Sequence, residues 1–197
     1  MKMIESGLEF DFVNGISVDK FDDTNFYRNS FNNLPNSKGV DFIAKNSNTL
    51  VLIEVKNCIG NECDNRWRIA PNNLKLTTTA TTVDTEGRNS LDIEVSQKIA
   101  MTLACLCGAN SKPNYQNSDQ LKPYFAMISN NNVSFGTKKI KVILFLEGDF
   151  STKSRKEKKV MKDLEDSIKS KLSWLNCHVL VENINTHAKD IYQASVI

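Results

Sequence analysis

The stretch KGVDFIAKNSNTLVLIEVKN, residues 38–57, constrains the fold of this chain more than any other segment. It holds two runs of strand-forming residues, 40–45 and 50–56, and the residues between them, Asn46-Ser47-Asn48-Thr49, have typical turn chemistry. The pattern predicts a β-hairpin with a four-residue loop, in which Lys45 pairs with Leu50. Because side chains alternate between the two faces of a strand, this register assigns a face to every residue of the hairpin.

The predicted register gives the hairpin one apolar face and one charged face. The apolar face carries Val40, Phe42, Ala44, Val51, Ile53 and Val55. The other face carries Asp41, Ile43, Leu50, Leu52, Glu54 and Lys56. Asp41 then lies opposite Glu54, at a separation of about 4.5–5.5 Å between Cβ atoms, where like charges destabilise a sheet. A positive group is therefore expected between the two acids, either a divalent metal or the nearby Lys56.

Two alternatives to a metal site stay open at this point. A register shift by one residue would place Glu54 on the opposite face from Asp41. An ordinary edge hairpin would use Lys56 for a structural salt bridge to one of the two acids.

Length and composition are those of a globular protein. The 197 residues are 40% hydrophobic and 24% charged, with a net charge of +2, which predicts one domain without a strong overall field. The first ten residues include Glu5 and Glu9 and lack the apolar run of a secretory leader, and no run approaches the roughly 20 apolar residues of a membrane span. We therefore expect a cytoplasmic protein without a membrane partner. An odd number of cysteines, five, favours free thiols over a disulfide framework.

The remaining pattern predicts an α/β (α+β) fold. We expect a second hairpin over 8–21 with the loop Val13-Asn14-Gly15, a short helix or ordered loop over 22–33, and a long irregular segment over 58–89. Apolar periodicity predicts helices over 92–109 and 153–175, and strands over 139–146 and 177–181. The stretch between 109 and 139, interrupted by Pro113 and Pro123, is expected to be a loop. The order predicts a single domain with a central mixed sheet and helices packed on it.

The element order and the charged motif together resemble the PD-(D/E)xK nuclease superfamily, which has the restriction-endonuclease-like fold. Asp41 matches the first acid of that motif, and Glu54-Val55-Lys56 matches its second part. The layout matches over residues 8–150, whereas the motif itself matches at only three positions, Asp41, Glu54 and Lys56. The chain has Val40 where the superfamily's name has proline.

The resemblance implies a metal-dependent nuclease that hydrolyses phosphodiester bonds, in DNA processing or defence. It implies Mg²⁺ or Mn²⁺ held by Asp41, Glu54 and the carbonyl of Val55, with Lys56 orienting or deprotonating the attacking water. The resemblance also implies an N-terminal acid, for which Glu9 is the candidate with Glu5 as the other choice, and a polar residue on the helix, for which Gln97 is the candidate. The alternative function is that of a nuclease-like fold without cleavage, which serves as a protein or nucleic-acid binding module.

Two basic segments predict contact with nucleic acid, with DNA favoured over RNA. Arg66-Trp67-Arg68 places an aromatic ring between two cations in the long segment over 58–89, which we expect to lie beside the site and bind substrate. The second segment holds Lys153, Arg155, Lys156 and Lys159. A structural anchor for Trp67 and a solvated helix face for the lysines are the alternatives, and association with a second copy of the chain is left open.

Overall fold

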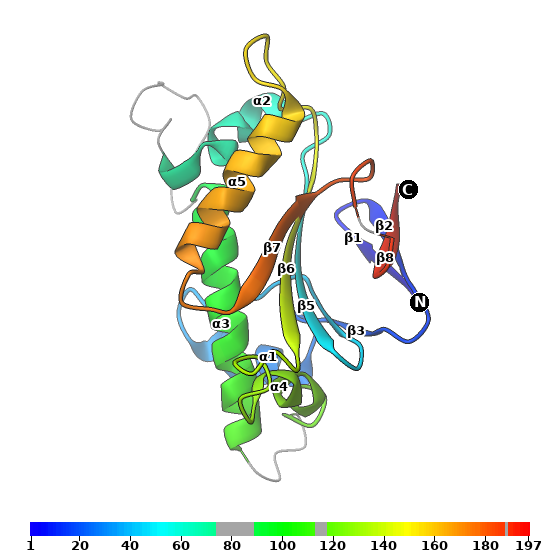
Figure 1. Ribbon diagram of the computed structural model, residues 1–197, viewed down its shortest axis with the longest axis vertical. Coiled ribbons are helices and arrows are strands. Elements are labelled where there is room, and N and C mark those ends of the chain that lie inside the picture. The colour runs from blue at the N-terminus through cyan, green and yellow to red at the C-terminus, as the bar shows by residue number, and fades with distance from the viewer. Residues whose placement is uncertain (74–88, 113–117, 188) are drawn as a thin grey trace.

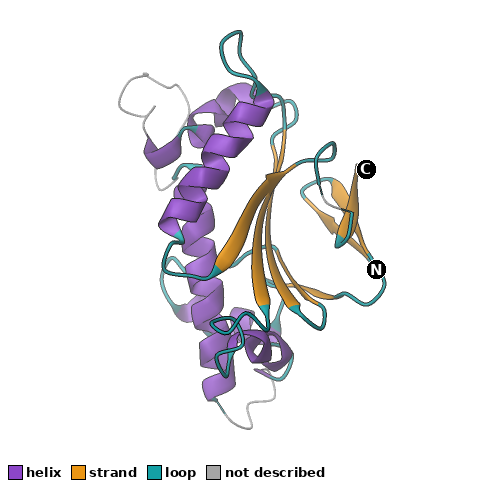
Figure 2. Cartoon of the chain, viewed as in Figure 1, coloured by secondary structure: helices purple, strands orange, loops and turns teal. Residues whose placement is uncertain are grey.

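A five-stranded sheet lies between a layer of helices and a smaller three-stranded sheet (Figure 1 and Figure 2). The computed structural model describes residues 1–73, 89–112, 118–187 and 189–197. The large sheet has the order β3-β4-β5-β6-β7, formed by Ser17–Lys20, Phe42–Lys45, Thr49–Asn57, Lys139–Glu147 and Cys177–Glu182. The small sheet has the order β1-β2-β8, formed by Lys2–Glu5, Leu8–Phe12 and Tyr192–Val196. The helices are α1 to α5, formed by Asn25–Asn29, Glu62–Asn65, Leu91–Ser111, Lys122–Ile128 and Glu157–Lys171.

The large sheet is mixed, as the sequence predicts. Strands β3, β4 and β5 are antiparallel neighbours, whereas β5, β6 and β7 run parallel to one another. The β4–β5 hairpin has the predicted register, with Lys45 opposite Leu50 and Phe42 opposite Ile53. Asp41 lies at a bend just before β4, and its N–H donates to the carbonyl of Ile53 at 3.0 Å. The predicted register is therefore confirmed from Lys45–Leu50 to Phe42–Ile53, whereas the predicted Asp41–Glu54 pair is not part of the observed ladder.

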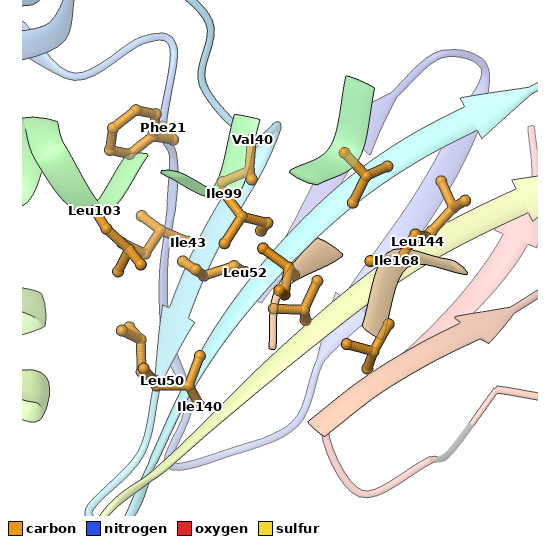
Figure 3. Close-up of a cluster of buried hydrophobic side chains, with 14 of the residues drawn as sticks. Phe21, Val40, Ile43, Leu50, Leu52, Ile99, Leu103, Ile140, Leu144 and Ile168 are labelled. Carbon is orange, nitrogen blue, oxygen red and sulfur yellow. The ribbon is translucent and has the colours of Figure 1, made fainter. Parts of the chain in front are cut away.

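Two apolar clusters fill the spaces between the three layers. The larger cluster lies between the helices and the large sheet, where Ile99 and Leu103 of α3 and Ile168 of α5 face Leu52 and Leu144 (Figure 3). The smaller cluster lies between the two sheets and collects Phe42, Ala44, Val51, Ile53 and Val55 with aromatic residues of β2 and β8. In the described part of the chain, no helix combines the length and apolar character needed to cross a membrane.

The bend at Asp41 corrects one predicted position. Val40 was expected on the apolar face with Phe42, but it packs in the larger cluster, on the helix side of the sheet. Strict alternation applies within a regular strand, and Val40 precedes the bend at which the regular strand begins.

The predicted hairpin over 8–21 is wrong. Strand β2 pairs with β1 and with β8, whereas β3 pairs with β4 in the other sheet. The first hairpin turns instead at Ser6-Gly7, where both residues have positive φ angles, 52° and 77°, as a tight two-residue β-turn between twisted strands requires. Residues 13–16 therefore carry the chain from one sheet to the other.

A helix replaces part of the predicted loop between 109 and 139. Helix α4 begins at Lys122, so Pro123 falls in its first turn, where no N–H is needed for the helix. Pro113 lies outside the described residues. In the segment 58–89, α2 and the short 3₁₀ helices η2 (Arg66–Ile69) and η3 (Pro71–Asn73) are present, whereas residues 74–88, with the Thr-rich run and Gly87, lie outside the described part.

A buried carboxylate, that of Asp92, ties η3 to α3 and α5. It accepts hydrogen bonds from Ser90 at 2.5 Å, from Ser167 at 2.8 Å and from the N–H of Asn72 at 3.0 Å, and it pairs with Lys171 at 2.7 Å. Burial alone would raise the pKa of Asp92, but these donors outweigh it and hold the pKa below its usual value. The charged side chain therefore fixes the residues that follow η2 against the helix layer.

Among the described glycines, Gly39 has the least room for a side chain, because its backbone lies against the ring of Phe21. A Cβ on Gly39 would lie 2.4 Å from Cδ1 of the fully buried Phe21. We expect Gly39→Ala to destabilise the protein by about 1–3 kcal/mol in denaturant unfolding, because the ring has no free space to move into. Gly108→Ala is the control, since a Cβ there would make an ordinary 3.6 Å contact with Phe26, and alanine favours a helix by roughly 0.5–1 kcal/mol over glycine. Equal stability of the Gly39→Ala and Gly108→Ala proteins would contradict this packing.

Candidate functional site

The carboxylates of Asp41 and Glu54 face the same ammonium group, that of Lys98 on α3. The Nζ atom of Lys98 lies 2.7 Å and 2.8 Å from the two carboxylate oxygens of Glu54, and 3.6 Å from Oδ1 of Asp41. The second oxygen of Asp41 accepts the N–H of Val55 at 2.6 Å. The two acids therefore converge on one side of the sheet, as the predicted register requires, and a positive group bridges them.

Lys56 connects Asp41 and Glu54 to a third acid, Glu94, which lies on α3. Its Nζ atom lies 2.8 Å from Oε1 of Glu54 and 3.1 Å from Oε1 of Glu94. Glu94 also pairs with Arg68 of η2, whose Nη1 lies 3.4 Å from Asn65. The cluster thus runs from the bend before β4, across the end of β5, to α3 and η2.

Six charged side chains make up this cluster, and their formal charges cancel. The three anions are Asp41, Glu54 and Glu94, and the three cations are Lys56, Lys98 and Arg68. Each carboxylate has at least one cationic partner. We refer to these six residues as the charged cluster.

Burial controls the protonation of Glu54. Its side chain is 0% exposed, and loss of hydration together with the charge of Asp41 raises the pKa of its carboxyl to about 7, because the ammonium groups of Lys56 and Lys98 offset these effects only in part. For Lys56, burial lowers the pKa, but the carboxylates of Glu54 and Glu94 outweigh burial and raise it. A lysine that acts as a base needs a lowered pKa. A bound cation would lower the pKa of Lys56 only if its charge outweighs the two carboxylates, which raise that pKa.

The donor atoms fit a hard divalent cation with few protein ligands. Lys98 identifies a point where one positive charge is held by oxygens of both Asp41 and Glu54. Within the described ranges, no group of three or more His, Cys, Asp or Glu side chains converges as a metal site. Mg²⁺ commonly uses one or two carboxylates and keeps several waters, so this pair suits Mg²⁺ better than a closed structural site. Val55 contacts the cluster through its N–H, and its carbonyl stays a predicted ligand.

The additional residues predicted for the site lie elsewhere. Glu9 is on the small sheet, on the side of the large sheet away from α3, where it pairs with Lys2 at 2.7 Å (Figure 1). Glu5 pairs with Lys20 at 2.8 Å. Gln97 is exposed, and its neighbour Lys98 reaches the acids instead. The structure therefore brings together Asp41, Glu54 and Lys56 but neither Glu9 nor Gln97.

The predicted nucleic-acid residues divide into buried and exposed groups. Trp67 is 5% exposed, so its ring is covered in this conformation and matches the structural alternative. Arg68 belongs to the charged cluster, and Arg66 lies at the surface of the same short helix. In the second segment, Lys153 and Lys156 are exposed, whereas Arg155 and Lys159 both pair with Asp163.

Sequence reasoning missed Glu94 and Lys98 as members of the cluster. These residues are four apart on the predicted helix 92–109, so they lie on one face of it. They also sit next to the buried Val95 and Ile99, which places that face toward the sheet. A charged pair beside the buried stripe of a helix was the signal that could have found them.

The family to which this chain belongs has no assigned function. No curated protein and no solved structure matches the chain. A family of unknown function, DUF6661, matches residues 24–196, a range that contains the whole charged cluster and leaves out β1, β2 and β3. The chain belongs to this family of unknown function, DUF6661.

Proposed function

We propose that the protein is a metal-dependent nuclease, with DNA as its first substrate to test, which hydrolyses phosphodiester bonds at the charged cluster. The observation that carries this proposal is the convergence of Asp41 and Glu54 on one cationic atom beside Lys56. Bound between these acids, Mg²⁺ or Mn²⁺ would neutralise charge on the phosphate and activate a water. The position at the carboxyl end of β5, among parallel strands, is where open α/β sheets commonly bind ligands.

Each residue of the cluster has a role in this proposal. Asp41 and Glu54 would hold the cation, and the N–H of Val55 fixes the orientation of the Asp41 carboxylate. Lys56 orients or deprotonates the attacking water and places a fixed positive charge near the developing negative charge. Glu94 positions Lys56, and Arg68 holds Glu94 in turn. For the cation to bind, the ammonium group of Lys98 would have to leave the space between the two acids.

One observation favours a second function, that of a binding module without cleavage. The formal charges of the charged cluster cancel without a metal, and Lys98 already bridges the two acids. A cluster of this kind would serve only to hold α3 against β5. In that case nucleic acid or a protein partner would bind elsewhere on the surface.

A cleavage assay distinguishes the two functions. Full-length protein is incubated with plasmid DNA, single-stranded DNA and RNA, in Mg²⁺, in Mn²⁺ and in EDTA. We expect cleavage in Mg²⁺ or Mn²⁺ and none in EDTA, because Asp41 and Glu54 alone repel a phosphate. Asp41→Asn is the control for a contaminating nuclease, and calorimetry with Mn²⁺ reports metal binding independently. Absence of both cleavage and Mn²⁺ binding would leave the binding module.

A further inference from the structure

A basic pocket of about 250 Å³ lies between the segments that follow β5 and β6. Its polar side chains are those of Arg66, Thr152, Ser154 and Arg155, and the buried Phe150 and Val160 form part of its apolar wall. A water molecule in the liquid occupies roughly 30 Å³, so the pocket has room for a phosphate group and part of its sugar. Among the described residues, the lining combines guanidinium and hydroxyl donors and includes no carboxylate.

Arg66 and Arg155 both have guanidinium N–H donors that are not used in pairs with described residues. The backbone N–H of Arg66 donates to the carbonyl of Cys63, whereas its guanidinium makes no hydrogen bond or ion pair with a residue that the structure describes. Arg155 pairs through one Nη with Asp163, and a guanidinium has five N–H donors. Asp149, on the loop after β6, has a lowered pKa, chiefly because Ser151 donates hydrogen bonds to it, and the positive charge of Arg66 adds to this effect. Arg66 therefore lies close enough to the loop after β6 for its charge to act on Asp149.

The short helix η2 connects this pocket to the charged cluster. Arg68 pairs with Glu94 inside the cluster, whereas Arg66, on the same helix, lines the pocket. Both sites follow the carboxyl ends of the parallel neighbours β5 and β6, and the N–H of Cys58 donates to the carbonyl of Glu147 where these strands end. Two buried N–H groups of η2, Nε1 of Trp67 and Nε of Arg68, have no acceptor among the described residues.

We propose that the pocket lined by Arg66, Thr152, Ser154 and Arg155 binds a backbone phosphate of the nucleic-acid strand that is cleaved at the charged cluster. This inference rests on the proposed function and names the contact that would position the strand. Guanidinium groups bind phosphate through paired, charge-assisted hydrogen bonds, and hydroxyl groups complete the set of donors. The exposed Lys153 and Lys156 beside the pocket add positive charge along the path of the strand.

Binding of a labelled oligonucleotide tests the pocket without cleavage. The full chain is titrated into a fluorescein-labelled DNA strand in EDTA, and anisotropy gives the Kd at several salt concentrations. We expect Arg66→Met to weaken binding about tenfold and to reduce the slope of log Kd against log salt by about one, as loss of one phosphate contact predicts. Inorganic phosphate should compete with the strand for the wild-type protein more strongly than for Arg66→Met.

Arg28→Met is the matched control, because it removes the same charge from an exposed position on α1, at the opposite end of the helix layer from η2 (Figure 1). Its Kd should stay within about twofold of wild type. Equal Kd values for the Arg66→Met and Arg28→Met proteins would overturn the pocket even if the protein cleaves DNA. A weaker Kd for Arg66→Met in a protein that cleaves nothing would support the pocket and refute the proposed nuclease.

Discussion

Lys56→Met is expected to lower the rate of metal-dependent cleavage at least about a hundredfold while Mn²⁺ binding persists. A positioned proton donor or acceptor typically contributes 10²–10⁴-fold, and methionine keeps the length of the side chain without its charge. The remaining partners hold the carboxylates, because Glu54 keeps Lys98 and Glu94 keeps Arg68. The cleavage rate and the Mn²⁺ affinity, measured on the same preparation, separate the chemical role of Lys56 from metal binding.

Lys45→Met provides the matched control for this variant. Lys45 ends β4, at the opposite end of the hairpin from Asp41, so the substitution removes one lysine charge from a neighbouring strand without touching the cluster. Its cleavage rate should stay within about twofold of wild type. A Lys56→Met protein that cleaves as fast as Lys45→Met would refute the role assigned to Lys56.

Glu54→Gln is expected to abolish Mn²⁺ binding and, without metal, to raise the stability of the protein at pH 8 by about 3 kcal/mol. Burial and the charge of Asp41 raise the pKa of Glu54 to about 7, above its usual 4.5, so the folded protein holds a proton that the unfolded chain releases. Wild-type stability therefore falls as pH rises from about 4.5 to about 7, and glutamine removes this loss. The gain should be nearly absent at pH 4.5, complete above pH 7 and measurable by denaturant unfolding.

Ion pairs that outweigh the burial of Glu54 would give the opposite sign for the same variant. Removal of one partner from a buried ion pair leaves a charge uncompensated, which typically costs about 3–5 kcal/mol. Glu165→Gln is the control, since it breaks an exposed pair with Lys162 and should change stability by no more than about 0.5 kcal/mol at any pH. A Glu54→Gln protein that is less stable than wild type at pH 8 would show that the ion pairs of Glu54 outweigh its burial and would contradict its raised pKa.

The parts of the fold that the sequence predicted correctly depend on local patterns. The turn at residues 46–49 and the alternation on either side of it specified the β4–β5 register, and the apolar periodicity of α3 and α5 specified their buried faces. The pairing of β2 with β8 was missed because β8 lies at the other end of the chain. No local pattern indicates that Phe10 lies opposite Ala194, and Asn14-Gly15 offered a nearer but incorrect turn.

The site was predictable to the same extent. Asp41, Glu54 and Lys56 lie within one hairpin, so a count along two strands was enough to bring them together. Lys98 and Glu94 come from a helix that crosses this hairpin, and their contacts depend on how α3 packs on β5. The angle and height of that packing depend on side-chain volumes throughout the larger cluster, which a pattern of residue types does not specify.

Because the formal charges of the charged cluster cancel, its electrostatic field acts on a polyanion only at short range. Three positive and three negative groups in contact produce a field that fades within a few ångströms, whereas unpaired surface charges act over the Debye length of about 8–10 Å at physiological salt. Attraction from a distance therefore comes from exposed residues such as Lys153 and Lys156 and not from the reacting groups. Different residues therefore attract the strand and carry out the reaction. Added salt should slow the association of protein and strand, whereas the rate of cleavage after binding should stay the same.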